Sequence, residues 1–268
     1  NFTKKTINMH QPLSYVHPSA KIANNVVIEP FVTIDKNVTI GKGSWIGSNV
    51  TIFEGATIGE NCRIFPGAVI SAIPQDLKFG GEKSEVIIGD NTTIRECVTI
   101  NRGTKVTGRT EIGNNCLLMA YSHIAHDCYI GNNCVIVNSV ALGGHITIGD
   151  WVIIGGLSAV HQFVHIGDHA MISGGALVRK DVPPFVKAAR EPLSFVGINS
   201  IGLRRRGFKD KKIQEIQNIY RILFQSNKNT TQAIAKIEGE LPVSPERDAI
   251  LSFIQNSGRG IMKGYMQN

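Results

Sequence analysis

The fold of this chain is decided by a six-residue repeat, which is clearest in residues 112–154, IGNNCLLMAYSHIAHDCYIGNNCVIVNSVALGGHITIGDWVII. Every sixth residue from Val16 to Val178 gives 28 positions, of which 26 are aliphatic. The two exceptions, Asp76 and Glu82, lie in a stretch that breaks the pattern. Gly often follows the aliphatic residue, and a small or β-branched residue stands four positions after it. Because such regularity is typical of stacked units, the repeat predicts a solenoid.

A six-residue unit is too short for a helix and is typical of a short strand plus a turn, with Gly or Asn supplying the turn conformation. Stacked units of this kind form a parallel β-helix. Four of the five cysteines occupy the small-residue position: Cys62, Cys116, Cys128 and Cys134. We expect them to be buried core residues with free thiols, because no CxxC or metal-ligand spacing occurs in the sequence.

The repeat resembles that of the hexapeptide-repeat acyltransferases. This resemblance implies an all-β left-handed parallel β-helix, in which three hexads make one 18-residue coil. We therefore expect residues 1–184 to form the β-helix. Two stretches, near 71–87 and at 101–111, replace hexads with polar, Gly-containing sequence. Long excursions from a solenoid often carry function.

The periodicity changes after Pro184, and residues 185–268 are predicted to form a small basic α-helical domain. Apolar residues between Ile213 and Leu223 recur at helical spacing, and residues 231–241 favour a further helix. Ser244 followed by Pro245 is typical of an N-cap with proline at the first helical position.

Charge divides the chain in the same way. Residues 1–178 hold 12 Lys+Arg and 13 Asp+Glu, a net charge of −1, whereas residues 179–268 hold 16 and 8, a net charge of +8. A charged fraction of only 18% excludes a disordered chain. The start at Asn1–Lys5 lacks the apolar core of a signal peptide, and no uncharged apolar run reaches about 18 residues. We therefore predict a cytoplasmic protein. Nucleic-acid binding is not predicted, because Phe208 is the single aromatic residue within the basic cluster at 204–212.

Residues 18 apart should lie above one another, with coils spaced by roughly 4.8 Å. His126, Gly144 and Gln162 share one such line, and Asp127 lies below His145. Because His161 neighbours Gln162, we expect three histidines within about 10 Å of one another along one edge. No Lys or Arg occurs between 110 and 178, so any cation at this edge would come from elsewhere.

This edge has the groups that acyl transfer requires. His126 could act as a general base, with Asp127 orienting its ring, and the Gly144 N–H could stabilise an oxyanion. A zinc site is the rival use of stacked histidines, but the third ligand would fall near 162, which is Gln. We therefore predict no metal. A set of polar, outward-facing corner residues without catalytic function is the remaining alternative.

The resemblance becomes specific at five motifs. They are HIAHDC at 123–128, QDLK at 75–78, GGH at 143–145, AVHQF at 159–163 and GLRRRGF at 202–208. Together, and over essentially the whole chain, they resemble the UDP-N-acetylglucosamine O-acyltransferases of lipid A biosynthesis. The resemblance implies transfer of a 3-hydroxyacyl group from acyl carrier protein to the 3-hydroxyl of UDP-N-acetylglucosamine. No cofactor is implied beyond the phosphopantetheine of the carrier protein.

The resemblance also implies roles for residues. His126 would be the base, Asp127 its orienting partner and Gly144 the oxyanion donor. A second group would line the sugar and acyl pocket: Gln75, Asp76, Lys78, His123, His145, His161 and Gln162. Asn199, Arg205 and Arg206 would hold the nucleotide. Gly174 matches a position associated with acyl-chain length, and Ile201 stands where the family often has an acidic residue.

Family members are trimers with sites between subunits, which would let Asp76 of one chain serve beside His126 of another. The basic tail would recruit the acidic carrier protein and the diphosphate. Two alternatives stay open: a related N-acyltransferase acting on a UDP-amino sugar, and a non-catalytic solenoid scaffold. The sequence leaves open the acyl-chain length, the choice of a 3-hydroxyl or 3-amino acceptor, the effect of Ile201 and the oligomeric state.

Overall fold

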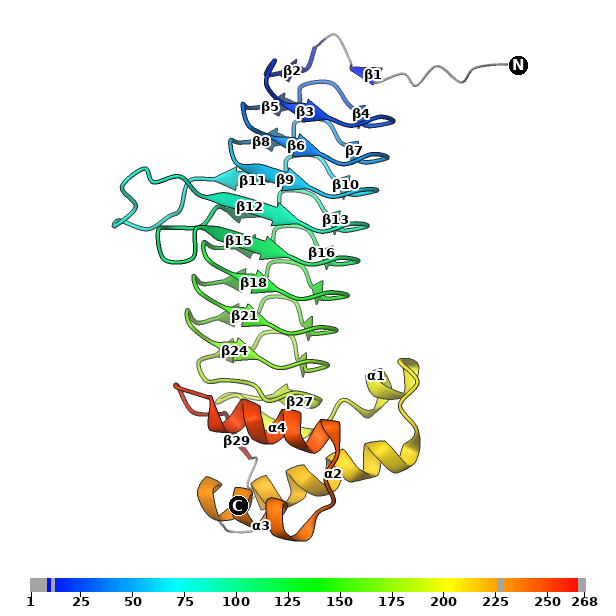
Figure 1. Cartoon of the computed structure of the whole chain (residues 1–268), viewed down its shortest axis with the longest axis vertical. Helices are drawn as coiled ribbons and strands as arrows, with labels where there is room; N and C mark the ends of the chain where they lie inside the picture. The colour runs from blue at the N-terminus through cyan, green and yellow to red at the C-terminus, as the bar shows by residue number, and fades with distance from the viewer. Residues whose placement is uncertain (1–8, 11–12, 226–228, 265–268) are drawn as a thin grey trace, which may run out of the picture.

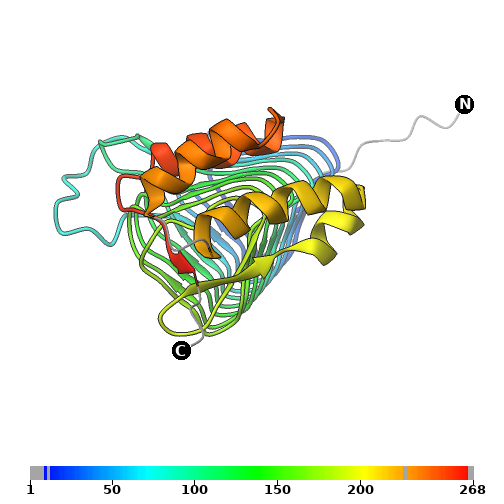
Figure 2. The same ribbon diagram turned by 90° about the horizontal axis from the view of Figure 1, so that it is seen from below.

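The computed structural model describes residues 9–10, 13–225 and 229–264. It is a left-handed parallel β-helix with a triangular cross-section, followed by a few helices at its C-terminal end (Figures 1 and 2). The predicted fold class is therefore confirmed. The start at Asn1–Lys5, where the absence of a signal peptide was predicted, lies outside the described residues.

Three sheets form the walls of the prism, and their strands are parallel except in one hairpin. Sheet A consists of β1 (Met9–His10), β4 (Val27–Ile28), β7 (Trp45–Ile46), β10 (Arg63–Ile64), β13 (Thr93–Ile94), β16 (Leu117–Leu118), β19 (Val135–Ile136), β22 (Ile153–Ile154), β25 (Met171–Ile172), β27 (Val186–Ala189), β28 (Ser194–Ile198) and β29 (Lys263–Gly264). Sheet B consists of β2 (Tyr15–Val16), β5 (Thr33–Ile34), β8 (Thr51–Ile52), β11 (Val69–Ala72), β14 (Thr99–Asn101), β17 (His123–Ile124), β20 (Ala141–Leu142), β23 (Ala159–Val160) and β26 (Leu177–Val178). Sheet C consists of β3 (Lys21–Ile22), β6 (Thr39–Ile40), β9 (Ala56–Ile58), β12 (Glu85–Ile88), β15 (Arg109–Ile112), β18 (Tyr129–Ile130), β21 (Thr147–Ile148) and β24 (His165–Ile166).

The register confirms the 18-residue coil. Ile124 pairs with Leu142, which pairs with Val160, so each hexad aliphatic residue lies directly above its counterpart. These residues fill the interior of the prism. The four cysteines predicted to be core residues are buried there, and burial raises the pKa of the Cys128 thiol to about 12.

Three edges join the sheets. We call them the B–C corner (residues 125–128, 143–146 and 161–164), the C–A corner (131–134, 149–152 and 167–170) and the A–B corner (137–140, 155–158 and 173–176). One residue in each of these turns has a positive φ. At the B–C corner these are Asp127, His145 and Phe163, with φ of 59°, 60° and 65°. The corner geometry therefore imposes the left-handed conformation even on residues that seldom adopt it.

Both excursions leave the B–C corner but are shorter than predicted. The loops span residues 73–84 and 102–108, because β11, β12, β14 and β15 extend into the stretches expected as loops. Buried Val86 of β12 pairs with buried Thr110 of β15, which draws this backbone into sheet C. Val106 keeps the hexad phase, yet 68% of its surface is exposed, because it lies in the second loop.

Residues 185–199, predicted as part of a helical domain, are not helical. Strands β27 and β28 form an antiparallel hairpin that continues sheet A, because buried Val186 and Ala188 extend the interior by one layer. The helices are α1 (Ser200–Arg205), α2 (Asp210–Gln225), α3 (Thr230–Glu240) and α4 (Pro245–Gln255).

The predicted helices after residue 199 are confirmed. The Ser244 hydroxyl accepts a hydrogen bond from the Arg247 N–H, as an N-cap should, and Pro245 occupies the first turn. The hydroxyl of fully buried Tyr220 donates to the Pro184 carbonyl at 2.6 Å, which ties α2 to the end of the prism. Within the described ranges, no helix is long and apolar enough to cross a membrane.

Candidate active site

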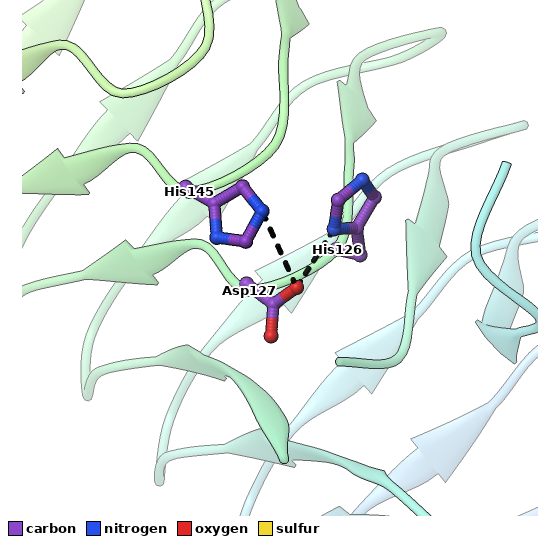
Figure 3. A group of neighbouring side chains, drawn as sticks. All are labelled: His126, Asp127 and His145. Carbon is purple, nitrogen blue, oxygen red and sulfur yellow. Dashed lines mark hydrogen bonds and ion pairs between the residues drawn. The ribbon is translucent and has the colours of Figure 1, made fainter. Parts of the chain in front are cut away.

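The B–C corner brings together a histidine and a carboxylate. His126 Nδ1 lies 2.7 Å from Asp127 Oδ2, and the Asp127 side chain is fully buried (Figure 3). A carboxylate can only accept, so Nδ1 carries the proton and Nε2 keeps its lone pair. This is the tautomer that a general base requires. The predicted pairing of His126 with Asp127 is therefore confirmed in its geometry.

The loop at 102–108 holds the Asp127 carboxylate in place. Oδ2 accepts from the Thr104 hydroxyl at 2.7 Å, and Oδ1 accepts from the Thr104 N–H at 3.0 Å and from the Thr107 hydroxyl. Burial by itself would raise the pKa of Asp127, but these hydrogen bonds and the one from His126 lower it to about 2. Asp127 is therefore ionised at neutral pH despite its burial.

Replacing Thr104 with valine, which has nearly the same shape, should destabilise the protein by about 1.5–3 kcal/mol at neutral pH, because a donor to a buried charge is lost. Since the folded-state pKa of Asp127 is depressed, this stabilisation is present above pH 4 and declines as the pH falls towards 2. Denaturant unfolding of both proteins from pH 7 to pH 3 measures the difference. Thr104→Ser, which keeps the hydroxyl, is the control. If the difference in unfolding free energy between the wild type and Thr104→Val does not become smaller as the pH falls, the role of the Asp127 charge is contradicted.

Gly144 lies one coil above His126 and leaves no room for a side chain. A Cβ atom at this position would be 2.7 Å from His126 Cε1 and 2.8 Å from Nε2. The Gly144 N–H donates to no acceptor in the described part of the chain, whereas its carbonyl accepts from Phe163 N at 3.1 Å. An unpaired N–H beside the base is the geometry expected of an oxyanion donor.

Two further histidines surround His126. His145 packs edge-on against His126, with ring centroids 5.0 Å apart, and stacks on Phe163 at 4.6 Å. Burial lowers the pKa of His145, partly opposed by the charge of Asp127. His123, on the outer face of sheet B, bonds to the Thr99 hydroxyl at 2.7 Å, and burial with repulsion from His126 lowers its pKa. Both rings are therefore held neutral beside the base.

The first excursion lies at the same corner. Asp76 is half-buried, accepts from Lys78 N at 3.0 Å, and its charge acts on His145 of the same chain. The expectation that Asp76 of one chain serves beside His126 of another stays a prediction. Gln75 and Lys78 are exposed. His161 and Gln162 are exposed at the next turn of the corner and contact Arg259 from the segment after α4.

The predicted nucleotide residues lie on a different edge. Arg206 Nη1 bonds to His169 Nδ1 at 3.2 Å and its guanidinium lies over the ring of Trp151, both at the C–A corner. Asn199 is buried and caps α1, with its side chain accepting from Gly202 N and donating to the His169 carbonyl. The structure gives Asn199 this capping role, which the sequence did not indicate. Arg205 and Ile201 are exposed on α1.

Gly174 lies at the third edge, the A–B corner. A Cβ atom there would be 3.1 Å from the Gly156 carbonyl, and the backbone is otherwise open to solvent. Within one chain, the predicted site residues therefore occupy three separate corners. Those of the B–C corner are brought together, whereas the nucleotide residues and Gly174 are not.

His126, Asp127 and His145 also form a cluster whose potential metal-ligand atoms lie within 4.8 Å of one another. Its hydrogen bonding fits a proton relay better than a metal site. Both Asp127 oxygens already accept from threonines, and His126 turns Nδ1 towards the carboxylate as a donor. The absence of a metal from the reaction stays a prediction.

Sequence reasoning missed four residues at this corner. Thr104 and Thr107 lie in an excursion that was noted for its length, which is the signal that could have found them. Phe163 continues the line of Asp127 and His145 at 18-residue spacing. Arg259 is 97 residues from Gln162 in sequence, and no pattern connects the two.

Comparisons with known proteins agree with this geometry. The family model described as UDP-N-acetylglucosamine O-acyltransferase, domain 2, matches residues 181–262, and the bacterial transferase hexapeptide model matches residues 109–144. An acyl-[acyl-carrier-protein]–UDP-N-acetylglucosamine O-acyltransferase from Trichlorobacter lovleyi is 54% identical over 254 residues, covering 93% of this chain and 97% of that protein.

Solved structures show the same similarity to UDP-N-acetylglucosamine acyltransferases. A UDP-N-acetylglucosamine acyltransferase from Bacteroides fragilis superposes with a TM-score of 0.94 at 54% identity, covering 95% of this chain and all of the other. The Arabidopsis enzyme of the same name has a TM-score of 0.83 at 32% identity, covering 97% of this chain and all of the other. The coverage extends through the β-helix, its B–C corner and the helical end, and so the chain belongs to the UDP-N-acetylglucosamine O-acyltransferase family.

Proposed function

We propose that this protein transfers a 3-hydroxyacyl group from acyl carrier protein to the 3-hydroxyl of UDP-N-acetylglucosamine, in lipid A biosynthesis. The observation that carries the proposal is the His126–Asp127 pair beside the free N–H of Gly144. The names of the family relatives supply the substrate class. A non-catalytic scaffold would have no need for a fully buried carboxylate that fixes the tautomer of a largely buried histidine.

The reaction follows from the geometry. His126 Nε2 takes the proton of the sugar hydroxyl as its oxygen attacks the thioester carbonyl carbon. Asp127 stabilises the imidazolium that forms, and the Gly144 N–H donates to the tetrahedral oxyanion. The intermediate then expels the phosphopantetheine sulfur, which receives the proton from His126. The products are the O-acylated nucleotide sugar and carrier protein with a free thiol, and no further cofactor takes part.

A threefold assembly would bring the separated corners together. The A–B corner exposes apolar side chains: Phe31, Tyr121 and Leu157 are 59%, 67% and 76% exposed. The outer face of sheet A is also apolar from Leu117 to Met171, whereas sheet C presents Thr147 and His165. We propose a homotrimer with the A–B corners at its axis, because this buries the apolar surface.

In that arrangement, sheet A of one chain faces sheet B of the next. The open end of the cleft between them pairs the C–A corner of one chain with the B–C corner of its neighbour. Arg205 and Arg206 would then face His126 of another subunit, and Gly174 would lie towards the inner end of the cleft. A glycine there leaves room for a long acyl chain. The exposed Arg205, Lys209 and Lys211 would attract the acidic carrier protein, and we place the reaction in the cytoplasm.

Turnover with UDP-N-acetylglucosamine and a series of 3-hydroxyacyl carrier proteins tests the function and identifies the chain length. A parallel assay uses the sugar nucleotide in which an amino group replaces the 3-hydroxyl. We expect the hydroxyl acceptor to be used. Preference for the amino acceptor would support the N-acyltransferase alternative, and no acyl transfer with either acceptor would exclude the proposed function.

Arg205→Ala should raise KM for the UDP-sugar about 10-fold or more with little change in kcat, because the lost contact is made equally in the ground and transition states. Steady-state kinetics at varied UDP-sugar concentration measures the two constants. Arg221→Ala, on α2, is the control and should not change KM. A fall in kcat alone would contradict the nucleotide role.

The same variant tests whether the site is shared. Mixed trimers of Arg205→Ala and His126→Ala chains, formed by co-expression, should contain one complete site each, because only one interface of three then joins an intact base to an intact arginine. Random assembly of equal amounts restores about a quarter of the wild-type sites. The activity of the mixed trimers is measured at low UDP-sugar concentration. If it is no higher than the mean of the activities of the two single variants, the whole site lies within one chain.

A further inference from the structure

The C-terminal segment after α4 is attached to the catalytic edge. Asp181 N donates to the Gly260 carbonyl at 3.2 Å, Met262 N donates to the Asp181 carbonyl at 3.0 Å, and the Ser257 hydroxyl donates to buried Asp181 Oδ2 at 2.6 Å. Lys180 Nζ donates to the Arg259 carbonyl. These bonds hold the backbone of Arg259 beside the B–C corner, although 97 residues separate it from Gln162.

The Arg259 side chain reaches His161. Its Nη1 donates to the Gln162 carbonyl at 3.0 Å, and its Nη2 lies 3.2 Å from His161 Nδ1. A guanidinium has donors only and stays charged, so the Nδ1 atom that faces it must accept through its lone pair. Neutral His161 therefore carries its proton on Nε2.

A competing arrangement exists. His161 Nδ1 also lies 3.1 Å from the Gln162 carbonyl, to which it could donate if it carried the proton. In that tautomer the Nη2 donor of Arg259 would face an N–H and would lose its acceptor. Arg259 therefore favours the Nε2–H tautomer, and without it the Nδ1–H tautomer could form. The neighbouring charged groups after β26 are already bonded: Lys180 Nζ donates to the Arg259 carbonyl, and Asp181 Oδ2 accepts from the Ser257 hydroxyl.

We propose that Arg259 is a positioning residue that holds His161 as the neutral Nε2–H tautomer, which makes His161 a hydrogen-bond donor to a substrate oxygen. Asp127 sets His126 to the opposite tautomer at the same corner. The two histidines, nearly two coils or about 10 Å apart, thereby take different roles: His126 accepts a proton and His161 donates a hydrogen bond. Arg259 also supplies a cation to an edge whose own strands have none between 110 and 178.

The tautomer is read directly by NMR of the full-length protein labelled with ¹⁵N in its histidine rings, with His161 assigned by comparison with His161→Ala. We expect the Nε2–H pattern for His161 in the wild type. In Arg259→Met, which keeps length but removes charge and donors, we expect the Nδ1–H pattern. An Nδ1–H pattern in the wild type, or an unchanged pattern in Arg259→Met, overturns the proposal.

Kinetics supply the second readout, which rests on the proposed function, whereas the NMR readout does not. Arg259→Met should lower kcat/KM about 5- to 20-fold, as expected for one lost hydrogen bond to a substrate. Arg259→Met should not lower kcat/KM further when His161 is already alanine. Arg259→Lys should recover part of the kcat/KM that Arg259→Met loses. Arg179→Met, which breaks an exposed ion pair with Glu191, is the matched control and should leave activity unchanged.

If Arg259→Met lowers kcat/KM as much in the His161→Ala background as in the wild type, Arg259 acts through the fold and not through His161, and the proposal fails. Thermal unfolding of each variant accompanies the assays, and we expect Tm within a few degrees of the wild type. Absence of acyl transfer in the wild type would refute the proposed function and leave the NMR result to decide the tautomer.

Discussion

Replacing His126 with alanine should lower kcat by about 10²- to 10⁴-fold, the range of a lost general base, while the fold and the assembly stay intact. The reason is that His126 alone at this corner has both an orienting carboxylate at 2.7 Å and a free Nε2. His145 lies farther from Asp127, at 3.8 Å, so it cannot replace the base without a shift of its ring. Steady-state turnover at saturating substrates measures the effect.

His165→Ala is the matched control for this experiment. His165 directly follows the B–C corner, but its exposed side chain lies on the outer face of sheet C and is not part of the cluster of His126, Asp127 and His145. We expect it to have wild-type turnover. Near-full activity in purified His126→Ala would remove His126 as the base and would leave the histidine cluster without an assigned proton acceptor.

Gly144→Ala should lower kcat by about 10²-fold, since displacing a catalytic group by about 1 Å can cost that much. The added methyl group would lie 2.7–3.2 Å from three atoms of the His126 ring, closer than carbon contacts allow, so the ring must move. Alanine keeps the backbone N–H, so this variant tests the position of the base separately from the oxyanion donor. Turnover and NMR of the His126 ring measure the two effects.

Gly239→Ala provides the control, because nothing lies within 4 Å of the corresponding Cβ on helix α3. It should leave turnover unchanged and stabilise the helix by about 1 kcal/mol. In the His126→Ala background, Gly144→Ala should lower kcat little further, because the ring it displaces is already absent. A full additional loss there would show that residue 144 acts on catalysis by another route.

The hexad repeat by itself determined most of the solenoid. An aliphatic residue every six positions can only be buried by stacking equivalent strands. The 18-residue coil was implied by the resemblance to the hexapeptide-repeat acyltransferases, and with it the vertical line of His126, Gly144 and Gln162 followed from counting. The cysteines followed in the same way, because the position they occupy faces the interior. The excursion lengths and the hairpin at 186–198 did not follow, since backbone pairing continues wherever a buried side chain such as Val86 or Val186 extends the core.

Only the tertiary structure decided how the corner works. The tautomer of His126 depends on its hydrogen bond to Asp127. The charge of Asp127 depends in turn on Thr104 and Thr107, whose loop returns to Asp127 from the preceding coil. Arg259 reaches His161 only because the segment after α4 folds back over the last coil. Periodicity specifies which residues share an edge. Contacts between non-repeating segments specify where His126 and His161 carry their protons and keep Asp127 ionised. These contacts depend on three-dimensional packing that no sequence spacing encodes.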